Sequence, residues 1–499
     1  MLSLHSTDAR RLMKRFQIGR TPGRWDNFLP PIQGGKYRKL LDVSPVRASD
    51  EWDEDSSSQS ITPPESPLFD KIRQRRNRGT RLEQDQEDTS SISSAITDES
   101  FSLDDLQPLS HLDVYTKTAI KLDEAKYPAL DHATQDGIVR KYRLLYRRID
   151  SEGLFNCNYK AYLIETFRYS ILLAFWVVAL KAGWFAISGL FLGMLWHQLV
   201  FTVHDAGHMG ITHDFQTDTV IGIIIADFIG GLSLGWWKRN HNVHHIVTNS
   251  PEHDPDIEHM PFFAISHRFF DSLRSTYYDR VMTYDTMAKF LIRYQNYLYY
   301  PIMLFGRFNL YRLSWEFLLL GQGPRKGPAW WHRWLEITGQ VVFWYWFGYL
   351  VLYRSIPTLG GRLAFLLISH MVTAPLHVQI TLSHFAMSTT DLGVDESFPQ
   401  KMLRTTMDVE CPPWVDFFHG GLQHQAIHHL YPRIPRHNLR RTQKLVQEFC
   451  SDVGIPYALY GFVDGNKQVI GKLADVGQQA AILAECQRAI TREKNFGFH

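Results

Sequence analysis

The sequence has few cysteines, almost no excess of charge and no long apolar run at its start. Its 499 residues include four cysteines, which lie far apart and form no CxxC pair. We therefore expect neither a disulfide framework nor a structural zinc site, and we expect a reducing compartment. Lys and Arg number 53 against 51 Asp and Glu, for a net charge of +2. This excess is too small for a surface that grips nucleic acid.

The first third of the chain is polar and divides into three segments. The opening MLSLHSTDARRLMKRF lacks the apolar core of a cleavable signal peptide and predicts a helix from Thr7 to Phe16, followed by loop to residue 40. Residues 41–108 are rich in serine and alternate acidic with basic runs. Such a composition buries too little apolar area to offset the entropy of ordering, so we expect a disordered linker. Residues 109–160 are predicted to form an amphipathic helical segment before the membrane.

Four later stretches are apolar enough to cross a bilayer, which takes about 20 residues per helix. They are about 163–181, 184–203, 336–353 and 362–383. Short turns join the members of each pair, whereas a long segment separates the two pairs. The sequence therefore predicts two helical hairpins, with both termini and the long middle segment on one side of the membrane.

Basic residues indicate which side that is. The short turns contain only Lys181, Arg354 and Arg362. The other side carries a larger set of basic residues: Lys141, Arg143, Arg147, Arg148, Lys160, Lys238, Arg239 and Lys401. By the positive-inside rule, the termini and the middle segment are predicted to be cytosolic. The apolar segments 218–237 and 297–320 are predicted to be helices that lie in the interface or pack on the bundle, with a fifth span at 218–237 as the competing topology.

Histidines gather in three clusters at the predicted cytosolic ends of these spans. The first is HDAGH and the second is HNVHH, whereas the third, QAIHH, begins with Gln425. On a helix, residues three and four apart project from one face, so each cluster can reach a common centre. The seven histidines are His204, His208, His241, His244, His245, His428 and His429.

One HxxxH pair is more often a packed or surface pair than a ligand set, but three clusters at one level indicate a metal site. Buried imidazoles without partners are unstable, and a metal ion supplies the partner. Imidazole suits iron, zinc and copper, while the lack of nearby thiolates argues against iron–sulfur sites. Two ions account for so many ligands better than one. His384, at the end of the last span, is an eighth candidate, and His377, two turns deeper, is a poorer one.

Three neighbouring polar residues are candidates for holding the ring N–H groups of the ligands. They are Asp205, Asn240 and Asp256, each of which also suits a helix cap.

Residues from about 140 to 450 resemble the membrane-bound fatty-acyl and sphingolipid desaturases. The resemblance rests on HDAGH, HNVHH and QAIHH together with WWKRNHNVHH, Asp254-Pro-Asp-Ile257 and HHLYP. Gln425 in the third box resembles the front-end subgroup. What the family implies is a di-iron centre that uses O₂ and electrons from NADH or NADPH, passed through a reductase and cytochrome b5. The implied iron ligands are the seven histidines and His384. Gln425 would be a weaker ligand or would hold a metal-bound water, with His424 as the reserve candidate.

The opening LHSTDARRLMKRFQIG is similar to the second haem-binding segment of cytochrome b5. This resemblance assigns haem b ligation to His5 alone, because the His-Pro-Gly-Gly segment of that module does not occur in residues 1–499. Residues 1–40 are therefore interpreted as a partial cytochrome b5 segment. Either the sequence is part of a longer chain, or electrons arrive from a separate cytochrome.

Within the subgroup, FQIGRTPGRWDNFLPPIQGGKYR, the Ser-rich linker and YPALDHATQDGIVRKYRLLY look most like fungal sphingolipid 8-desaturases. The resemblance implies a trans double bond in the long-chain base of ceramide and a location in the endoplasmic reticulum. Two alternatives remain open, namely a front-end fatty-acyl desaturase or lipid hydroxylase, and a non-catalytic metal-binding membrane protein.

The predicted fold is an all-α membrane protein with four transmembrane helices under a cytosolic helical cap. The cap holds the di-iron site, the desaturase domain covers residues 161–450, and residues 451–499 form a C-terminal cytosolic tail. A short cytochrome b5 remnant precedes the linker.

Overall fold

The computed structural model describes residues 7–16 and 111–496. Helix α1 (Thr7–Arg15) confirms the helix predicted at the start of the chain. His5 and the segment 41–108 lie outside the described residues, so the haem ligand and the linker stay predictions. Two helices precede the first apolar segment, α3 (His111–Lys126) and α4 (His132–Ser151), and α4 buries the apolar face that its helical spacing predicts.

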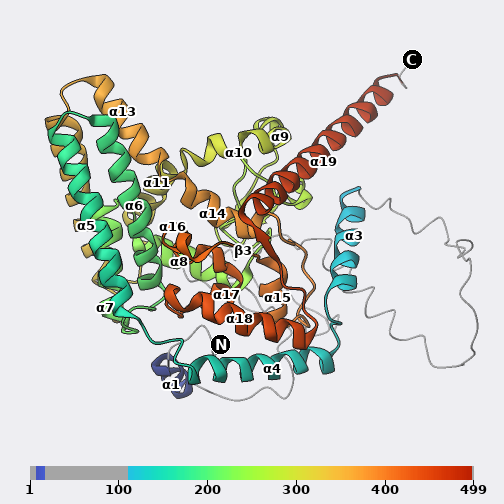
Figure 1. Ribbon diagram of the computed structural model, residues 1–499. Coiled ribbons are helices and arrows are strands. Elements are labelled where there is room, and N and C mark those ends of the chain that lie inside the picture. The colour runs from blue at the N-terminus through green and yellow to red at the C-terminus, as the bar shows by residue number, and fades with distance from the viewer. Residues whose placement is uncertain (1–6, 17–110, 497–499) are drawn as a thin grey trace, which may run out of the picture. The chain divides into compact units, whose positions relative to one another are not determined.

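The first hairpin consists of α5 (Tyr159–Lys181) and α6 (Phe185–Gly207), joined by a turn in which Gly183 has a φ of +75°. Only 11% of the apolar window of α5 is buried, against 56% for α6. Helix α6 is the inner helix because it packs on both α5 and α13 (Leu359–Met371), and the three lie side by side (Figure 1). The exposed apolar surface of α5 is the kind that lipid covers.

A bent helix follows the first hairpin. Helix α7 (Phe215–Ile223) continues into the π-helical segment η2 (Ile224–Ile229), and the chain then bends by 118° into α8 (Leu234–Val247). Asp227 accepts hydrogen bonds from the Leu234 N–H and from Gln340. Glu336 accepts one from the Gly235 N–H. These buried carboxylates satisfy the free N–H groups at the start of α8, which explains an acidic residue inside an apolar segment.

The middle of the chain is a series of short elements. Helices α10 (Gln295–Met303) and α11 (Gly306–Leu319) confirm the helices expected within 297–320. Tyr297, Tyr300 and Phe305 on or beside α10 are exposed, as expected of helices that lie in a membrane interface. The elements are η3 (His267–Asp271), β1 (Arg274–Ser275), β2 (Arg280–Val281), α9 (Thr286–Arg293), α10 (Gln295–Met303) and α11 (Gly306–Leu319).

In the described ranges, three helical segments are long and apolar enough to cross a membrane, or four if the bent pair counts as one span. Besides α5 and α6, the third is Leu359–Phe385, which combines α13 with α14 (Ala374–Phe385). The predicted span 336–353 is not among them. It is divided between α12 (His332–Phe343) and the π-helical segment η4 (Trp344–Ser355).

The last part of the chain surrounds α17 (Gln425–Leu430), the helix that carries the third histidine cluster. In this part β3 (Asp408–Glu410) pairs in parallel with β4 (Leu459–Gly461). The fold is therefore predominantly helical with two small sheets that the all-α prediction did not include. The elements are α15 (Phe398–Thr405), β3 (Asp408–Glu410), η5 (Pro413–Val415), α16 (Asp416–His419), η6 (Leu422–His424), α17 (Gln425–Leu430), α18 (Arg436–Val453), β4 (Leu459–Gly461) and α19 (Phe462–Phe496).

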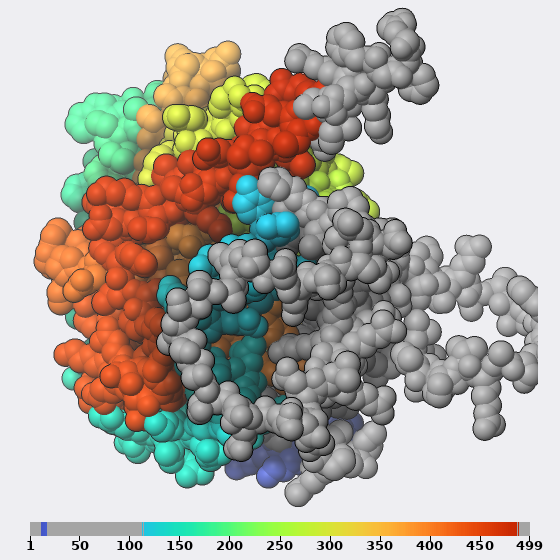
Figure 2. Space-filling model, turned by 90° about the vertical axis from the view of Figure 1, so that its right-hand side faces the viewer, coloured from blue at the N-terminus to red at the C-terminus, as the bar shows by residue number. Residues whose placement is uncertain are grey.

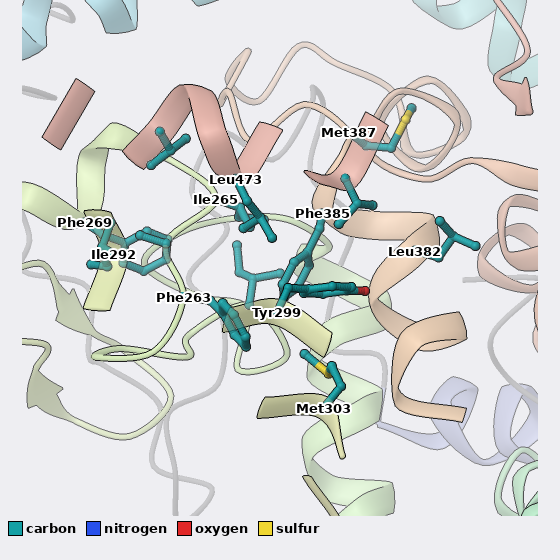
Figure 3. Packing of buried hydrophobic residues seen from close by; sticks show 14 of the residues in the cluster. Phe263, Ile265, Phe269, Ile292, Tyr299, Met303, Leu382, Phe385, Met387 and Leu473 are labelled. Carbon is teal, nitrogen blue, oxygen red and sulfur yellow. The ribbon is translucent and has the colours of Figure 1, made fainter. Parts of the chain in front are cut away.

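Helix α19 contributes Val469, Leu473, Val476 and Ala480 to the core. It packs against α9 and α10, and Figure 2 shows the red helix lying on the yellow-green segment that carries them. In the cluster of Figure 3, Leu473 of α19 lies near Tyr299 of α10 and Phe385 of α14. The Tyr299 hydroxyl points toward α14 and lies 2.6 Å from the Thr381 hydroxyl. Residues beyond 450 therefore help to hold α14 in position.

A buried arginine ties α15 to α3. The Arg404 guanidinium is fully buried and donates two hydrogen bonds to Glu396, at 2.7 and 2.8 Å, and one to Asp123 at 2.9 Å. Removing one partner of a buried ion pair leaves an uncompensated charge. We therefore predict that Arg404→Met lowers the stability of the protein by about 3–5 kcal/mol, measured as a large fall in the apparent Tm in detergent.

The matched control is Arg148→Met, because the Arg148 side chain is half exposed in its ion pairs with Glu152 and Glu448. Exposed ion pairs contribute little to the free energy of unfolding, so the apparent Tm of Arg148→Met should equal that of the wild type. An unchanged Tm for Arg404→Met would show that the buried pair does not hold these elements together.

Candidate metal centre

The first histidine cluster lies at the end of α6. His204 is in the last turn, and His208 directly follows the helix, where Met209 has a φ of 57°. Gly207 lets Trp237 approach, since a Cβ at this position would lie 2.2 Å from the indole ring. The Trp237 ring stacks on His241 with centroids 4.5 Å apart. Trp237 thus joins the first cluster to the second.

The other ligand candidates come from three further elements. Helix α8 carries the second cluster, α17 carries His428 and His429, and His384 is in the last turn of α14. These helices converge in the interior beside α6 (Figure 1). The His245 ring lies between the clusters, with centroids 4.8 Å from His208 and 4.2 Å from His429. All eight histidines predicted as ligands therefore share one site.

The ring nitrogens fall into two main groups whose candidate ligand atoms lie within 4.8 Å of one another. His241 and His244 also form such a set with Asp256. The arrangement provides two adjacent places for a metal ion, as the number of histidines suggested. The first group is His204, His208, His241 and His428, and the second is His244, His384 and His429.

The chemistry of these nitrogens fits a metal ion. Six of them are buried and have no hydrogen-bond partner among the described residues, and each would cost about 1–3 kcal/mol if left unpaired. Burial lowers the pKa of His428 and His429 well below the usual value for histidine, and the neighbouring histidines lower it further. Both rings are therefore neutral, which is the form that binds metal. The six atoms are Nε2 of His204, His208, His428 and His429, and Nδ1 of His245 and His384.

Two neighbours fix how the rings of the second group are protonated. The His244 Nδ1–H donates to Asp254 at 2.8 Å. Burial lowers the pKa of His244, but the carboxylates of Asp254 and Asp256 outweigh burial and raise it to about 9, so a metal ion at Nε2 would displace a proton. The Thr248 hydroxyl donates to the His244 carbonyl at 2.7 Å, so its oxygen accepts the Nδ1–H of His429 at 3.1 Å. His429 therefore presents an unprotonated Nε2. Asp254 and Thr248 were not predicted from the sequence.

The three predicted acceptors have different positions. Asp256 lies beside the second cluster, with its carboxylate 3.5 Å from the His241 Nδ1. Asn240 donates to Asp256 rather than accepting from a ligand ring. Asp205 accepts from Tyr162 and pairs with Arg436. The candidate role of Asp205 as a partner of a ligand ring is therefore wrong, because its carboxylate serves a buried arginine.

The remaining candidates lie at the edge of the site. Gln425 begins α17 one turn before His428 and is 4% exposed, so its amide is buried beside the ligands. His424 belongs to neither main group, and its Nδ1 lies 3.8 Å from Asp408. His377 is buried two turns deeper, and a Cβ at Gly306 would lie 3.1 Å from its ring.

The sequence of the chain is similar to that of known desaturases along its whole length. It is 63% identical over 497 residues to the Delta 8-(E)-sphingolipid desaturase of Emericella nidulans, which covers 100% of this chain and 88% of that protein. The Delta 8-(E)-sphingolipid desaturase of Kluyveromyces lactis is 47% identical over 510 residues, covering 99% and 86% of the two chains. The Delta(8)-fatty-acid desaturase of Helianthus annuus is 38% identical over 362 residues, covering 71% and 76%.

The family model described as fatty acid desaturase matches residues 182–461, a range that holds all eight histidines of the site. With this match and the similarity of the full chain, the protein belongs to the fatty acid desaturase family.

Proposed function

We propose that this protein is a di-iron, O₂-dependent desaturase that introduces a trans double bond at position 8 of the long-chain base of ceramide. The observation that carries the proposal is the set of buried, unpartnered imidazole nitrogens in a chain so similar to Delta 8-(E)-sphingolipid desaturases. The predominantly helical fold and its apolar helices agree with a membrane enzyme. Four spans, residence in the endoplasmic reticulum and a cytosolic site belong to the same proposal.

The first main group of histidines would hold one iron ion and the second main group the other. His245 lies between the groups, and Gln425 would bind weakly or hold a water. Iron and O₂ would supply the oxidant that removes hydrogen from an unactivated methylene, which no amino-acid base can do. Two electrons would come from NADH or NADPH through a reductase and cytochrome b5.

The residues of the chain have positional tasks in this reaction. Asp254 and Thr248 hold the Nδ1 protons of His244 and His429, so Nε2 is the nitrogen of each ring that would bind iron. The Trp237 ring packs against His204 and His241 and so limits how these two rings of the first main group can turn. The specificity of the reaction then depends on which methylene of a bound chain lies against the site.

We predict that His244→Ala or His428→Ala abolishes desaturation without preventing membrane insertion, because each change removes a ligand. The test is lipid analysis of cells with saturated long-chain bases that express the full chain together with a cytochrome b5. The wild type should produce Δ8-unsaturated bases in ceramide. His267→Ala, which removes a hydrogen bond to Thr116, is the control and should keep activity.

Retained unsaturation in both variants would contradict the metal role of the two histidines. Unsaturation of fatty acyl chains alone, hydroxylated products, or no lipid product from the wild type would instead favour the alternatives named above.

We predict that Gln425→Ala lowers the iron content of the purified protein more than His424→Ala does. Gln425 is one turn from His428, whereas His424 lies outside both main groups. Iron per chain, measured by elemental analysis, compares the two variants. The opposite order would assign the weaker ligand to His424.

We predict that Asp254→Asn weakens iron binding by about 10- to 100-fold, because the amide holds the His244 ring less firmly than the carboxylate does. The measurement is iron retained against increasing chelator, with Asp279→Asn as the control, since Asp279 pairs with Arg274 away from the site. If Asp254→Asn and the wild type retain the same amount of iron, Asp254 does not hold the His244 ring for metal binding.

A further inference from the structure

A large cavity lies on the predicted membrane side of the histidine site. Its volume is about 1440 Å³, and α5, α6, α10, α13, α14, α16 and α19 contribute to its walls. Met194 and Tyr300 in the lining are 40% and 46% exposed, whereas Leu172, Met303 and Val378 are buried. The cavity therefore opens to the surface where α5 and α10 present apolar side chains, and it reaches from there into the packed interior.

Most polar side chains of the lining are already paired within the protein. Arg168 donates to Gln198 at 3.1 Å, and the Gln198 amide donates to the Phe417 carbonyl at 2.9 Å. The Tyr300 hydroxyl donates to Asn466 at 3.0 Å, and the Asn466 amide donates to a backbone carbonyl of α19. A polar ligand group would find few partners here and would lose its hydrogen bonds to water. The cavity therefore suits a hydrocarbon chain.

The cavity is separate from the metal site. None of the eight histidines of that site is among the described residues that line it. On α6, Phe201 lies between the lining residue His197 and the ligand candidate His204. The Phe201 side chain is buried and packs with Leu376 and Leu422. A chain held in the cavity therefore lies apart from the metal site.

The substrate of the proposed function has two hydrocarbon chains that need different places. In ceramide, a long-chain base and a fatty acyl chain are joined by one amide group. Only the long-chain base is desaturated in the proposed reaction, so the acyl chain has to be held away from the metal site. A cavity that is apolar, open toward lipid and lined by no ligand histidine meets this requirement.

We propose that the cavity holds the N-acyl chain of the substrate while the long-chain base lies against the metal site. This inference rests on the proposed function and deepens it. The volume exceeds the roughly 300–1,000 Å³ of pockets for drug-sized ligands, so a long acyl chain has room. Since lipid is about as apolar as the lining, the cavity makes room for the second chain rather than selecting its length.

Two glycines provide a matched pair of test variants. Gly471 of α19 lines the cavity, whereas Gly360 of α13 is not among the described residues that line it. A Cβ at either position would have no neighbour within 4 Å. Gly471→Trp should therefore fill part of the cavity, and Gly360→Trp adds the same ring elsewhere. Met194→Trp fills the cavity from α6 as a second test variant.

Each full-length protein, loaded with iron and supplied with cytochrome b5, receives equal amounts of N-palmitoyl and N-acetyl long-chain base in vesicles. The ratio of the two Δ8-unsaturated products does not depend on how much of the protein is folded. We expect the palmitoyl share to fall about tenfold in Gly471→Trp and Met194→Trp, because the longer chain then overfills the cavity. Gly360→Trp should keep the wild-type ratio. A wild-type ratio in both cavity variants overturns the proposal.

A second measurement needs no turnover. Iron-loaded wild-type protein without an electron donor receives a ceramide with a photoreactive diazirine at the end of its N-acyl chain. We expect labelling of Leu172 or Met303, which line the cavity and are buried, and less labelling by a phosphatidylcholine with the same diazirine. Equal labelling by both lipids assigns the cavity to bilayer lipid and overturns the proposal. If the wild type makes no unsaturated long-chain base from ceramide, the proposed function itself fails.

Discussion

The structure depends on the cost of burying imidazole nitrogens without partners. The fold brings eight histidine rings from four helices into a space where, among the described residues, six of their nitrogens have no hydrogen-bond partner. At about 1–3 kcal/mol each, these groups would consume much of the stability of a typical domain. Metal ions bound to the folded chain would offset this cost, and metal binding would then be coupled to the stability of the helical layer around the site.

The same constraint explains how the surrounding helices are built. A ligand ring binds a metal well only if its other nitrogen is held, and the loop after α8 supplies Asp254 and Thr248 for this purpose. The bent pair α7–α8 needs its own polar groups in an apolar region, and Asp227 and Glu336 provide them at the start of α8. The positions of Asp254, Asp227 and Glu336 each follow from a backbone or ring donor that the carboxylate satisfies.

Much of the site could be predicted from the sequence because most ligands come in local repeats. A spacing of three or four residues on a helix is readable from one chain, and it identified the three clusters. His384 could be placed from its depth at the end of an apolar stretch. Asp254 could not, because the carboxylate that holds His244 is ten residues away across the end of α8. Only the path of the chain after that helix brings the two together.

The membrane helices could be predicted from the sequence where apolar residues form an uninterrupted run. The helices α5 and α6 match two predicted spans closely, whereas the stretch 336–353 is divided between an α-helix and a π-helical segment. The sequence prediction did not include Leu473 and its neighbours in the core. The buried residues Val469, Leu473, Val476 and Ala480 recur every three or four positions, so this stripe was readable as one face of a helix, whereas its partners α9 and α10 were not.

Asp205 shows why the position of a residue beside a ligand does not reveal its role. Its carboxylate pairs with Arg436 of α18, and the same guanidinium pairs with Glu165 of α5. The residues are distant in sequence, so only the tertiary structure shows the competition for Asp205. Buried ion pairs often add little net stability, but a pairing with fixed geometry can specify one arrangement. Arg436 also donates to the Phe201 carbonyl, so its guanidinium holds two points near the end of α6, directly beside the first histidine cluster.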